Sequence, residues 1–170
     1  MDTTRDGAFV VFGGSIITAY GLVSLATSYY LNGMTTLGTG DYLRLWALTF
    51  LVIAFGFATV LGGFLLASRG EWKRWGGAAL SVIGSLMGMI LALGLITTVA
   101  GLSSSISPYQ VTSSQSAQFS LTLQIQVIGS IIAVFLGFPL AMYGMMAGVM
   151  HWFHEPDESP EPEAAMEPSP

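Results

Sequence analysis

The chain has 170 residues, of which 52% are hydrophobic and only 9% are charged, and its mean hydropathy is +0.67. Soluble domains carry about 25% charged residues because a hydrated surface needs them, so this composition excludes an ordinary water-soluble fold. Residues 75–154 contain no Asp, Glu, Lys or Arg, as expected for a chain in lipid, where a charge at mid-membrane is costly. The sequence therefore predicts an integral membrane protein.

Four apolar blocks are each long enough for a helix of ~20 residues to cross the hydrocarbon core. They cover residues 8–30, 43–68, 75–102 and 119–152. We therefore expect an all-α membrane protein, a four-transmembrane-helix bundle made of two helical hairpins within residues 1–154. The acidic, Pro-rich residues 155–170 cannot bury apolar surface and are expected to form a disordered tail.

Basic residues indicate which ends of the spans face the cytoplasm. The N-terminal segment has neither a positive n-region nor a cleavage site, so the first block is interpreted as a retained span. Arg69, Lys73 and Arg74 lie between the second and third blocks. Arg5 precedes the first block, and only Arg44 lies on the other side. Because Lys and Arg in short loops favour the cytoplasm, both termini are expected there, with the chain in the cell (plasma) membrane.

Aromatic residues cluster at the predicted span ends, where amphipathic rings favour the headgroup level. The expected belts are Tyr29, Tyr30, Tyr42 and Trp46 at the outer interface, and Trp72, Trp75 and Trp152 at the inner one. Ordinary packing is an equally good explanation for any single ring.

The fourth block is longer than a membrane requires. Residues 119–152 would form a helix roughly 50 Å long, which must tilt or project beyond a core of about 30 Å. Pro139 predicts a kink, which is either a hinge or a passive feature. The polar link 103–118 before it is interpreted either as a flexible loop or as a segment that lies against a partner.

Small residues at helical spacing form the strongest pattern. In the third and fourth spans they are Gly77, Ser81, Gly84, Gly88, Gly129, Ala133, Gly137, Ala141, Gly144 and Gly148. In the first and second spans they are Gly14, Thr18, Gly21, Ser28, Ala47, Ala54, Ala58 and Gly62. Helices in lipid associate mainly where small residues let their backbones approach, so these stripes predict packing surfaces. The surfaces lie either inside the bundle or between this chain and another molecule.

The sequence offers little catalytic or metal-binding chemistry. His151 and His154 share a helical face next to Glu155 and Asp157, a set that can bind metals. Pro156 breaks the helix there, and we interpret the histidines as solvated anchors without a metal. Two histidines on one face cannot hold a haem from both sides, so no cofactor is expected from this chain alone. Bound lipid is expected, and a haem or pigment shared with another subunit stays open.

Transport and enzymatic activity receive no support from the spans. No span has an ionisable group at its middle, and no catalytic constellation is present, so we do not expect an enzyme. Gln124 and Gln126 are expected to point to different faces of the fourth helix. The hydroxyls of Thr18, Thr49, Thr59, Thr97 and Thr98 are expected to bond to carbonyls of their own helices.

These features favour a non-catalytic accessory subunit of a larger prokaryotic membrane complex, with respiratory and photosynthetic electron transfer as candidate processes. Its expected partners are membrane lipids, other integral membrane subunits and a basic cytoplasmic partner for the tail. The predicted docking residues are Glu155, Asp157, Glu158, Glu161, Glu163 and Glu167. A small homo-oligomeric channel or transporter and a membrane-organising scaffold are the alternatives. No basic face for nucleic acid is present in the sequence.

Overall fold

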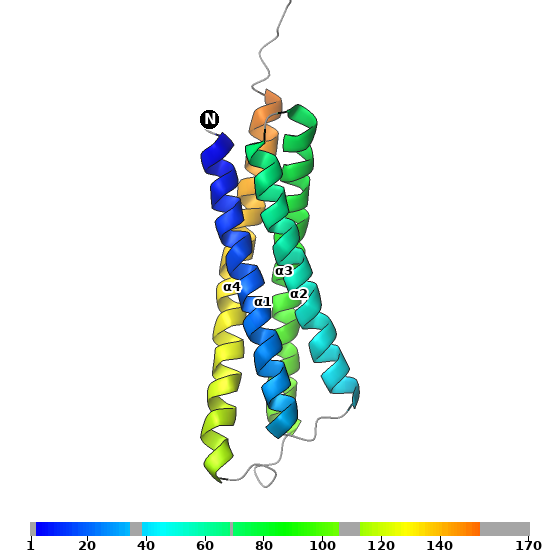
Figure 1. The fold of residues 1–170 in the computed structure, drawn as a ribbon, viewed down its shortest axis with the longest axis vertical. Helices are drawn as coiled ribbons and strands as arrows, with labels where there is room; N and C mark the ends of the chain where they lie inside the picture. Colours follow the sequence, from blue (N-terminus) through cyan, green and yellow to red (C-terminus); the bar gives the residue numbers. More distant parts are fainter. Residues whose placement is uncertain (1–2, 35–38, 69, 106–112, 154–170) are drawn as a thin grey trace, which may run out of the picture.

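The computed structural model describes residues 3–34, 39–68, 70–105 and 113–153, which form four helices (Figure 1). They are α1 (Thr3–Met34), α2 (Thr39–Ala67), α3 (Glu71–Ser105) and α4 (Ser113–Phe153). Each contains a stretch long and apolar enough to cross a membrane, at Arg5–Tyr30, Gly40–Ala67, Glu71–Gly101 and Ser120–Met150. In the described residues, the predicted all-helical architecture with four helices long and apolar enough to span a membrane is confirmed. The tail, residues 155–170, lies outside the described residues.

The helices are longer than the predicted spans, most clearly around the two links between α1 and α2 and between α3 and α4. Only residues 35–38 and 106–112 separate these helices, whereas the sequence predicted links at 31–42 and 103–118. Side-chain hydropathy marks where apolar residues end, but the backbone continues to satisfy its own hydrogen bonds in the interface. With 41 residues, α4 is roughly 60 Å long and exceeds the hydrocarbon core at one end or both.

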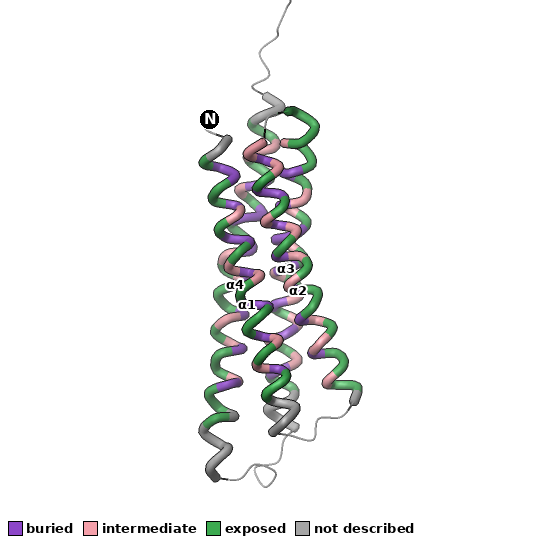
Figure 2. Tube along the Cα trace, viewed as in Figure 1, coloured by how far each residue is buried: buried purple, intermediate pink, exposed green. Residues whose placement is uncertain are grey.

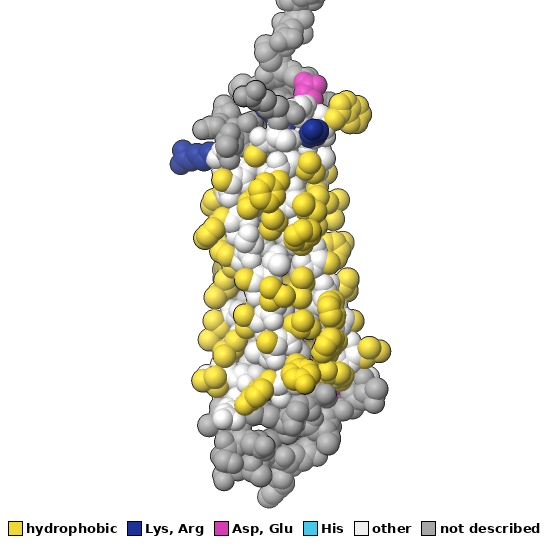
Figure 3. Space-filling model, viewed as in Figure 1, with side chains coloured by type: hydrophobic (Ala, Val, Ile, Leu, Met, Phe, Trp, Pro, Cys, Tyr) yellow, Lys and Arg dark blue, Asp and Glu magenta, His cyan; other side chains and the backbone are white. Residues whose placement is uncertain are grey.

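The helices form an antiparallel ring in chain order. Each packs against the next, and α4 also contacts α1, while α1 and α3 barely touch across the middle. The start of α1, the end of α4 and the α2–α3 turn lie together at what we call the termini end (Figure 1). Lys and Arg side chains appear at this end in Figure 3. The arrangement corresponds to two helical hairpins side by side.

Three of the helices begin with an acidic residue in the first turn: Asp6 in α1, Asp41 in α2 and Glu71 in α3. A carboxylate there interacts favourably with the positive end of the helix dipole. Gly70, with φ 125°, allows the sharp turn between α2 and α3, because a side chain would disfavour this backbone conformation. The Arg74 Nε then donates to the Ser68 carbonyl (3.3 Å) and holds the turn together.

Buried residues repeat with steps of three and four along each helix, which produces continuous inward-facing stripes (Figure 2). The repeat is clearest in α2, where it comprises the buried residues Leu45, Thr49, Val52, Gly56, Thr59, Gly63 and Leu66, and Gly62 beside it is buried too. Steps of this kind average 3.5 residues and keep one face toward a neighbouring helix, as in left-handed bundles.

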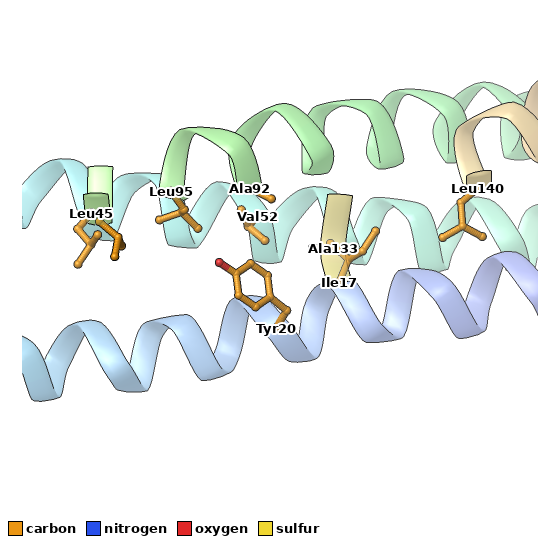
Figure 4. Packing of buried hydrophobic residues seen from close by; sticks show 9 residues of the cluster. Ile17, Tyr20, Leu45, Val52, Ala92, Leu95, Ala133 and Leu140 are labelled. Carbon is orange, nitrogen blue, oxygen red and sulfur yellow. The ribbon is translucent and has the colours of Figure 1, made fainter. Parts of the chain in front are cut away.

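The apolar core contains few large side chains. Ile17, Leu45, Leu95 and Leu140 are almost completely buried, and Ala133 fills the space near Ile17 (Figure 4). Most other inward positions hold Gly, Ser, Thr or Ala. Large apolar side chains cover the outside instead, including Phe12 (67% exposed) and Phe135 (73%), and Figure 3 shows them over one face of the bundle. This distribution suits a lipid surround, in which apolar side chains need no burial.

Hydroxyl groups inside the spans bond to the backbone of their own helices, as the sequence predicted. Thr18 donates to Gly14 O (2.9 Å), Thr49 to Leu45 O (2.8 Å) and Thr59 to Phe55 O (2.9 Å). Thr97 and Thr98 both donate to Gly94 O. The donor protons of these threonines are therefore satisfied without help from water or another helix.

Candidate functional site

The α1–α2 interface is built from glycines that let the two backbones touch. A Cβ atom at Gly14 would lie 2.8 Å from the Val60 backbone nitrogen. A Cβ at Gly56 would lie 2.8 Å from the Thr18 nitrogen, and one at Gly63 would lie 2.8 Å from the Gly7 carbonyl oxygen. Real Cβ atoms essentially never come this close to backbone atoms, so any larger residue would push the helices apart.

The α2–α3 interface is equally close. A Cβ at Gly77 would lie 2.6 Å from the Leu66 nitrogen, and a Cβ at Gly84 would lie 2.8 Å from the Phe55 carbonyl oxygen. The α3–α4 interface is slightly wider, because a Cβ at Gly137 would stay 3.1 Å from the Ser85 carbonyl oxygen.

The structure therefore places the predicted packing stripes of α3 and α4 against neighbouring helices of the same chain. All are buried except Gly129 and Gly148, which are half-buried. The set comprises Gly77, Ser81, Gly84, Gly88, Gly129, Ala133, Gly137, Ala141, Gly144 and Gly148. A Cβ atom at Gly88 would lie 3.5 Å from the Ile17 Cγ2 atom of α1, across the bundle. These contacts within the chain leave the stripes unavailable to a partner while the bundle is closed.

The predicted small-residue stripe of α2 behaves differently. Ala47 and Ala54 are exposed and Ala58 is half-buried, so only Gly62 of that stripe is buried. The residues that α2 turns inward, Gly56 and Gly63 among them, were not singled out from the sequence. Residue size and spacing did not distinguish the two faces, because the exposed Ala47 and Ala54 are seven residues apart, as are the buried Gly56 and Gly63.

The contact between α1 and α4 is of another kind. Its glycines meet side chains and not backbone: Gly13 faces Leu140, and a Cβ at Gly129 would lie 2.5 Å from the Tyr20 ring. Fewer residues meet here than at the other three interfaces between neighbouring helices. Most of the hydrogen bonds that side chains of the described residues make across helices join α1 to α4.

Gln126 is the centre of these bonds. It is 1% exposed, and its Nε2 donates to the Ser24 carbonyl oxygen (3.2 Å) and to Thr27 Oγ1 (2.6 Å). Its Oε1 accepts a hydrogen bond from Ser24 Oγ (3.2 Å), and Ser28 Oγ lies 3.5 Å from Nε2. Both ends of the amide are thus paired, which removes the penalty for burying it in an apolar interior.

Tyr20 and Ser130 extend the group by one turn. Ser130 Oγ donates to the Gln126 carbonyl oxygen (2.8 Å), so its lone pairs remain free to accept the proton of the Tyr20 hydroxyl. Tyr20 is 8% exposed and Ser130 1%. We call Tyr20, Ser24, Thr27, Ser28, Gln126 and Ser130 the α1–α4 polar cluster.

A second polar contact joins the same two helices near the termini end. The Tyr143 hydroxyl of α4 donates to the Asp6 carboxylate of α1, which is 9% exposed. The Phe9 and Tyr143 rings pack beside it with centroids 5.5 Å apart. Between this pair and the polar cluster lies an apolar layer that contains Ile17 and Leu140 (Figure 4).

The polar cluster consists of neutral donors and acceptors that satisfy one another. Hydrogen bonds between membrane helices are worth about 0.6 kcal/mol on average and up to about 1.7 kcal/mol each. They depend on register, because Ser24, Thr27 and Ser28 lie on one face of α1 opposite Gln126 and Ser130 on one face of α4. The arrangement can therefore hold α4 at one height and rotation against α1.

No functional role for Gln126 was predicted from the sequence. The expected difference between the two glutamines is confirmed, since Gln124 is exposed and Gln126 is buried. The hydroxyl residues Ser24, Thr27 and Ser28, which share one face of the first span, could have indicated polar partners for Gln126.

Metal-ligating residues do not gather in the described part of the chain. No group of three or more His, Asp or Glu side chains is close enough there to hold a metal ion. The His151 side chain, His154 and the six acidic docking residues predicted in the tail lie outside what the structure describes. Comparison with known proteins assigns no relative: no family model, no curated protein and no solved structure matches this chain.

Proposed function

We propose that the chain is a non-catalytic subunit of a larger membrane complex and that it binds a partner helix through the outward face of α2. The proposal includes a plasma-membrane location with both termini in the cytoplasm. It also includes a basic cytoplasmic partner for the acidic tail. The single observation that supports it most is the size pattern of the exposed residues on α2.

The outward face of α2 repeats every seven residues. Its members are Leu43, Ala47, Phe50, Ala54, Phe57, Leu61 and Phe64, and all of them are exposed. Phe50, Phe57 and Phe64 are 52%, 55% and 61% exposed, and Ala47 and Ala54 lie between successive large residues. Large and small side chains therefore alternate from Leu43 to Phe57, and the face continues with the large residues Leu61 and Phe64.

This alternation is what a helix interface requires. In heptad packing, large side chains enter spaces next to small ones on the facing helix. Lipid chains adapt to any apolar surface, so lipid contact alone gives no reason for a regular size repeat. By contrast, the exposed residues of α4 are almost all large, among them Ile125, Ile132, Phe138 and Met146. The α2 face is the better candidate for a protein contact.

The test is native mass spectrometry of the chain purified from its own membranes in mild detergent. The wild type is expected in a stoichiometric assembly with other polypeptides. Ala54→Leu fills the small position and is expected to remove the partners, whereas Ala79→Leu, at an exposed position on α3, is expected to leave the assembly intact. Both positions are exposed, so neither variant disturbs the bundle core.

Three results would contradict the proposal. A lone wild-type monomer would argue against any complex. An assembly of this chain alone would favour the homo-oligomeric channel or the scaffold, which ion or solute flux in proteoliposomes would then separate. An intact complex with Ala54→Leu would place the contact on another face.

A further inference from the structure

We propose that the α1–α4 interface is a hydrogen-bonded latch at which the bundle opens while the other three interfaces stay closed. Gln126 is its central residue. This inference does not depend on the proposed function, because it concerns motion within one chain.

The interfaces between neighbouring helices differ in how closely their backbones approach. At α1–α2 and α2–α3, glycines bring backbone against backbone over several turns, as at Gly14, Gly56 and Gly77. Such contacts are lost only when whole helices separate. The glycines between α1 and α4 instead face side chains, Leu140 and the Tyr20 ring, so the two backbones do not touch at these positions.

Among the described residues, polar contacts between helices are concentrated at the α1–α4 interface. Where backbone packing is weakest, the structure holds Gln126 bonded to Ser24 and Thr27, and Tyr20 bonded to Ser130. At the termini end it holds Tyr143 bonded to Asp6. Hydrogen bonds are short-ranged and directional, so a few of them can hold an interface that has few backbone contacts, and they are lost together when the two helices separate.

The order of the helices along the chain also favours opening between α1 and α4. The first and last helices are joined to each other only through space, whereas α2 and α3 are linked by a short turn around Gly70. Separation of α1 from α4 therefore strains no link between consecutive helices. Opening at this interface leaves the α1–α2, α2–α3 and α3–α4 contacts intact.

The test uses the absence of cysteine from the chain, so that one introduced thiol is the only target. Thr122→Cys reports on the latch: Thr122 is 5% exposed, lies one turn from Gln126 on α4 and bonds only to its own helix, at Gln118 O. Thr59→Cys is the matched reporter at the α2–α3 interface, 0% exposed and bonded to its own Phe55 O. Each is combined with Gln126→Leu or with the control Gln124→Leu, at the exposed glutamine.

Labelling by a membrane-permeant maleimide measures how often each buried thiol opens. With Gln126→Leu, labelling at Thr122→Cys is expected to be about five- to thirtyfold faster than with Gln124→Leu, as expected for loss of one or two hydrogen bonds. At Thr59→Cys the two backgrounds are expected to label at the same rate. Tyr20→Phe, which removes one hydroxyl, is the milder variant and is expected to cause a smaller increase at Thr122→Cys only.

An equal increase at both reporters would mean that Gln126 supports the bundle as a whole, which overturns the latch. No increase at Thr122→Cys with either Gln126→Leu or Tyr20→Phe would overturn it as well.

Discussion

Two adjacent glycines show how one missing methyl group decides the distance between helices. A Cβ at Gly77 would lie 2.6 Å from the Leu66 nitrogen and 2.7 Å from the Gly62 carbonyl oxygen, whereas a Cβ at Gly76 would have no atom within 4 Å. Both residues are in α3, so their intrinsic helix propensities are the same. Any difference between their substitutions must come from packing.

We therefore expect opposite effects from the same substitution at these two positions. Gly77→Ala should lower the free energy of unfolding by about 1–3 kcal/mol, because the Leu66 and Gly62 backbone cannot yield without moving α2. Gly76→Ala should raise it by about 0.5–1 kcal/mol, since alanine loses less conformational freedom in a helix. Equilibrium unfolding of both variants in mixed detergent micelles measures the difference. Equal effects would mean that the helices are not in backbone contact.

At the scale of elements, polar side chains join α1 to α4 at three heights: the Asp6–Tyr143 pair, the polar cluster and the Tyr30–Gln118 pair. The Asp6–Tyr143 pair is the simplest buried contact, because it consists of one hydrogen bond between two side chains. Tyr143→Phe keeps the ring and its contact with Phe9, at 5.5 Å between centroids, and removes only the hydroxyl. The pair can therefore be tested without making a cavity.

A double-mutant cycle with Asp6→Asn and Tyr143→Phe should give a coupling energy of about 0.5–2 kcal/mol. The reason is that the hydroxyl proton of Tyr143 then loses a charged acceptor in a poorly hydrated site. The free energies of unfolding of wild type, both single variants and the double variant provide the measurement. Additive effects, within about 0.3 kcal/mol, would show that the two side chains do not interact.

The same scale shows what the sequence could predict. Four helices followed from apolar blocks such as residues 75–102, because a bilayer leaves the backbone few alternatives. The sequence predicted less well which side of each helix faces its neighbours. The α3 and α4 stripes lie in helix contacts, but Ala47 and Ala54 of α2 face outward. Hydropathy does not show which side of a membrane helix faces inward, because the interior of the bundle and its lipid-facing surface are both apolar. The inward side of a helix is indicated instead by the small-residue stripes of α3 and α4 and by the hydroxyl pattern around Gln126.

For the whole molecule, an even number of spans places both termini on one side, and the charges indicate which side. Arg5, Lys73 and Arg74 lie at the termini end, and Arg44 lies in α2 near the opposite end. This imbalance of basic residues is the only sequence signal for orientation, because the acidic residues contribute little.

We expect the termini end to face the cytoplasm. Asp41→Cys, at the exposed start of α2, should react with a membrane-impermeant maleimide on intact cells. Trp72→Cys, at a position 91% exposed at the start of α3, should react only after the membrane is permeabilised. The chain has no other thiol, so labelling reports one site at a time. The reverse pattern would invert the topology. It would place the acidic tail outside the cell, which would remove the cytoplasmic partner from the proposed function and leave the helix contacts unchanged.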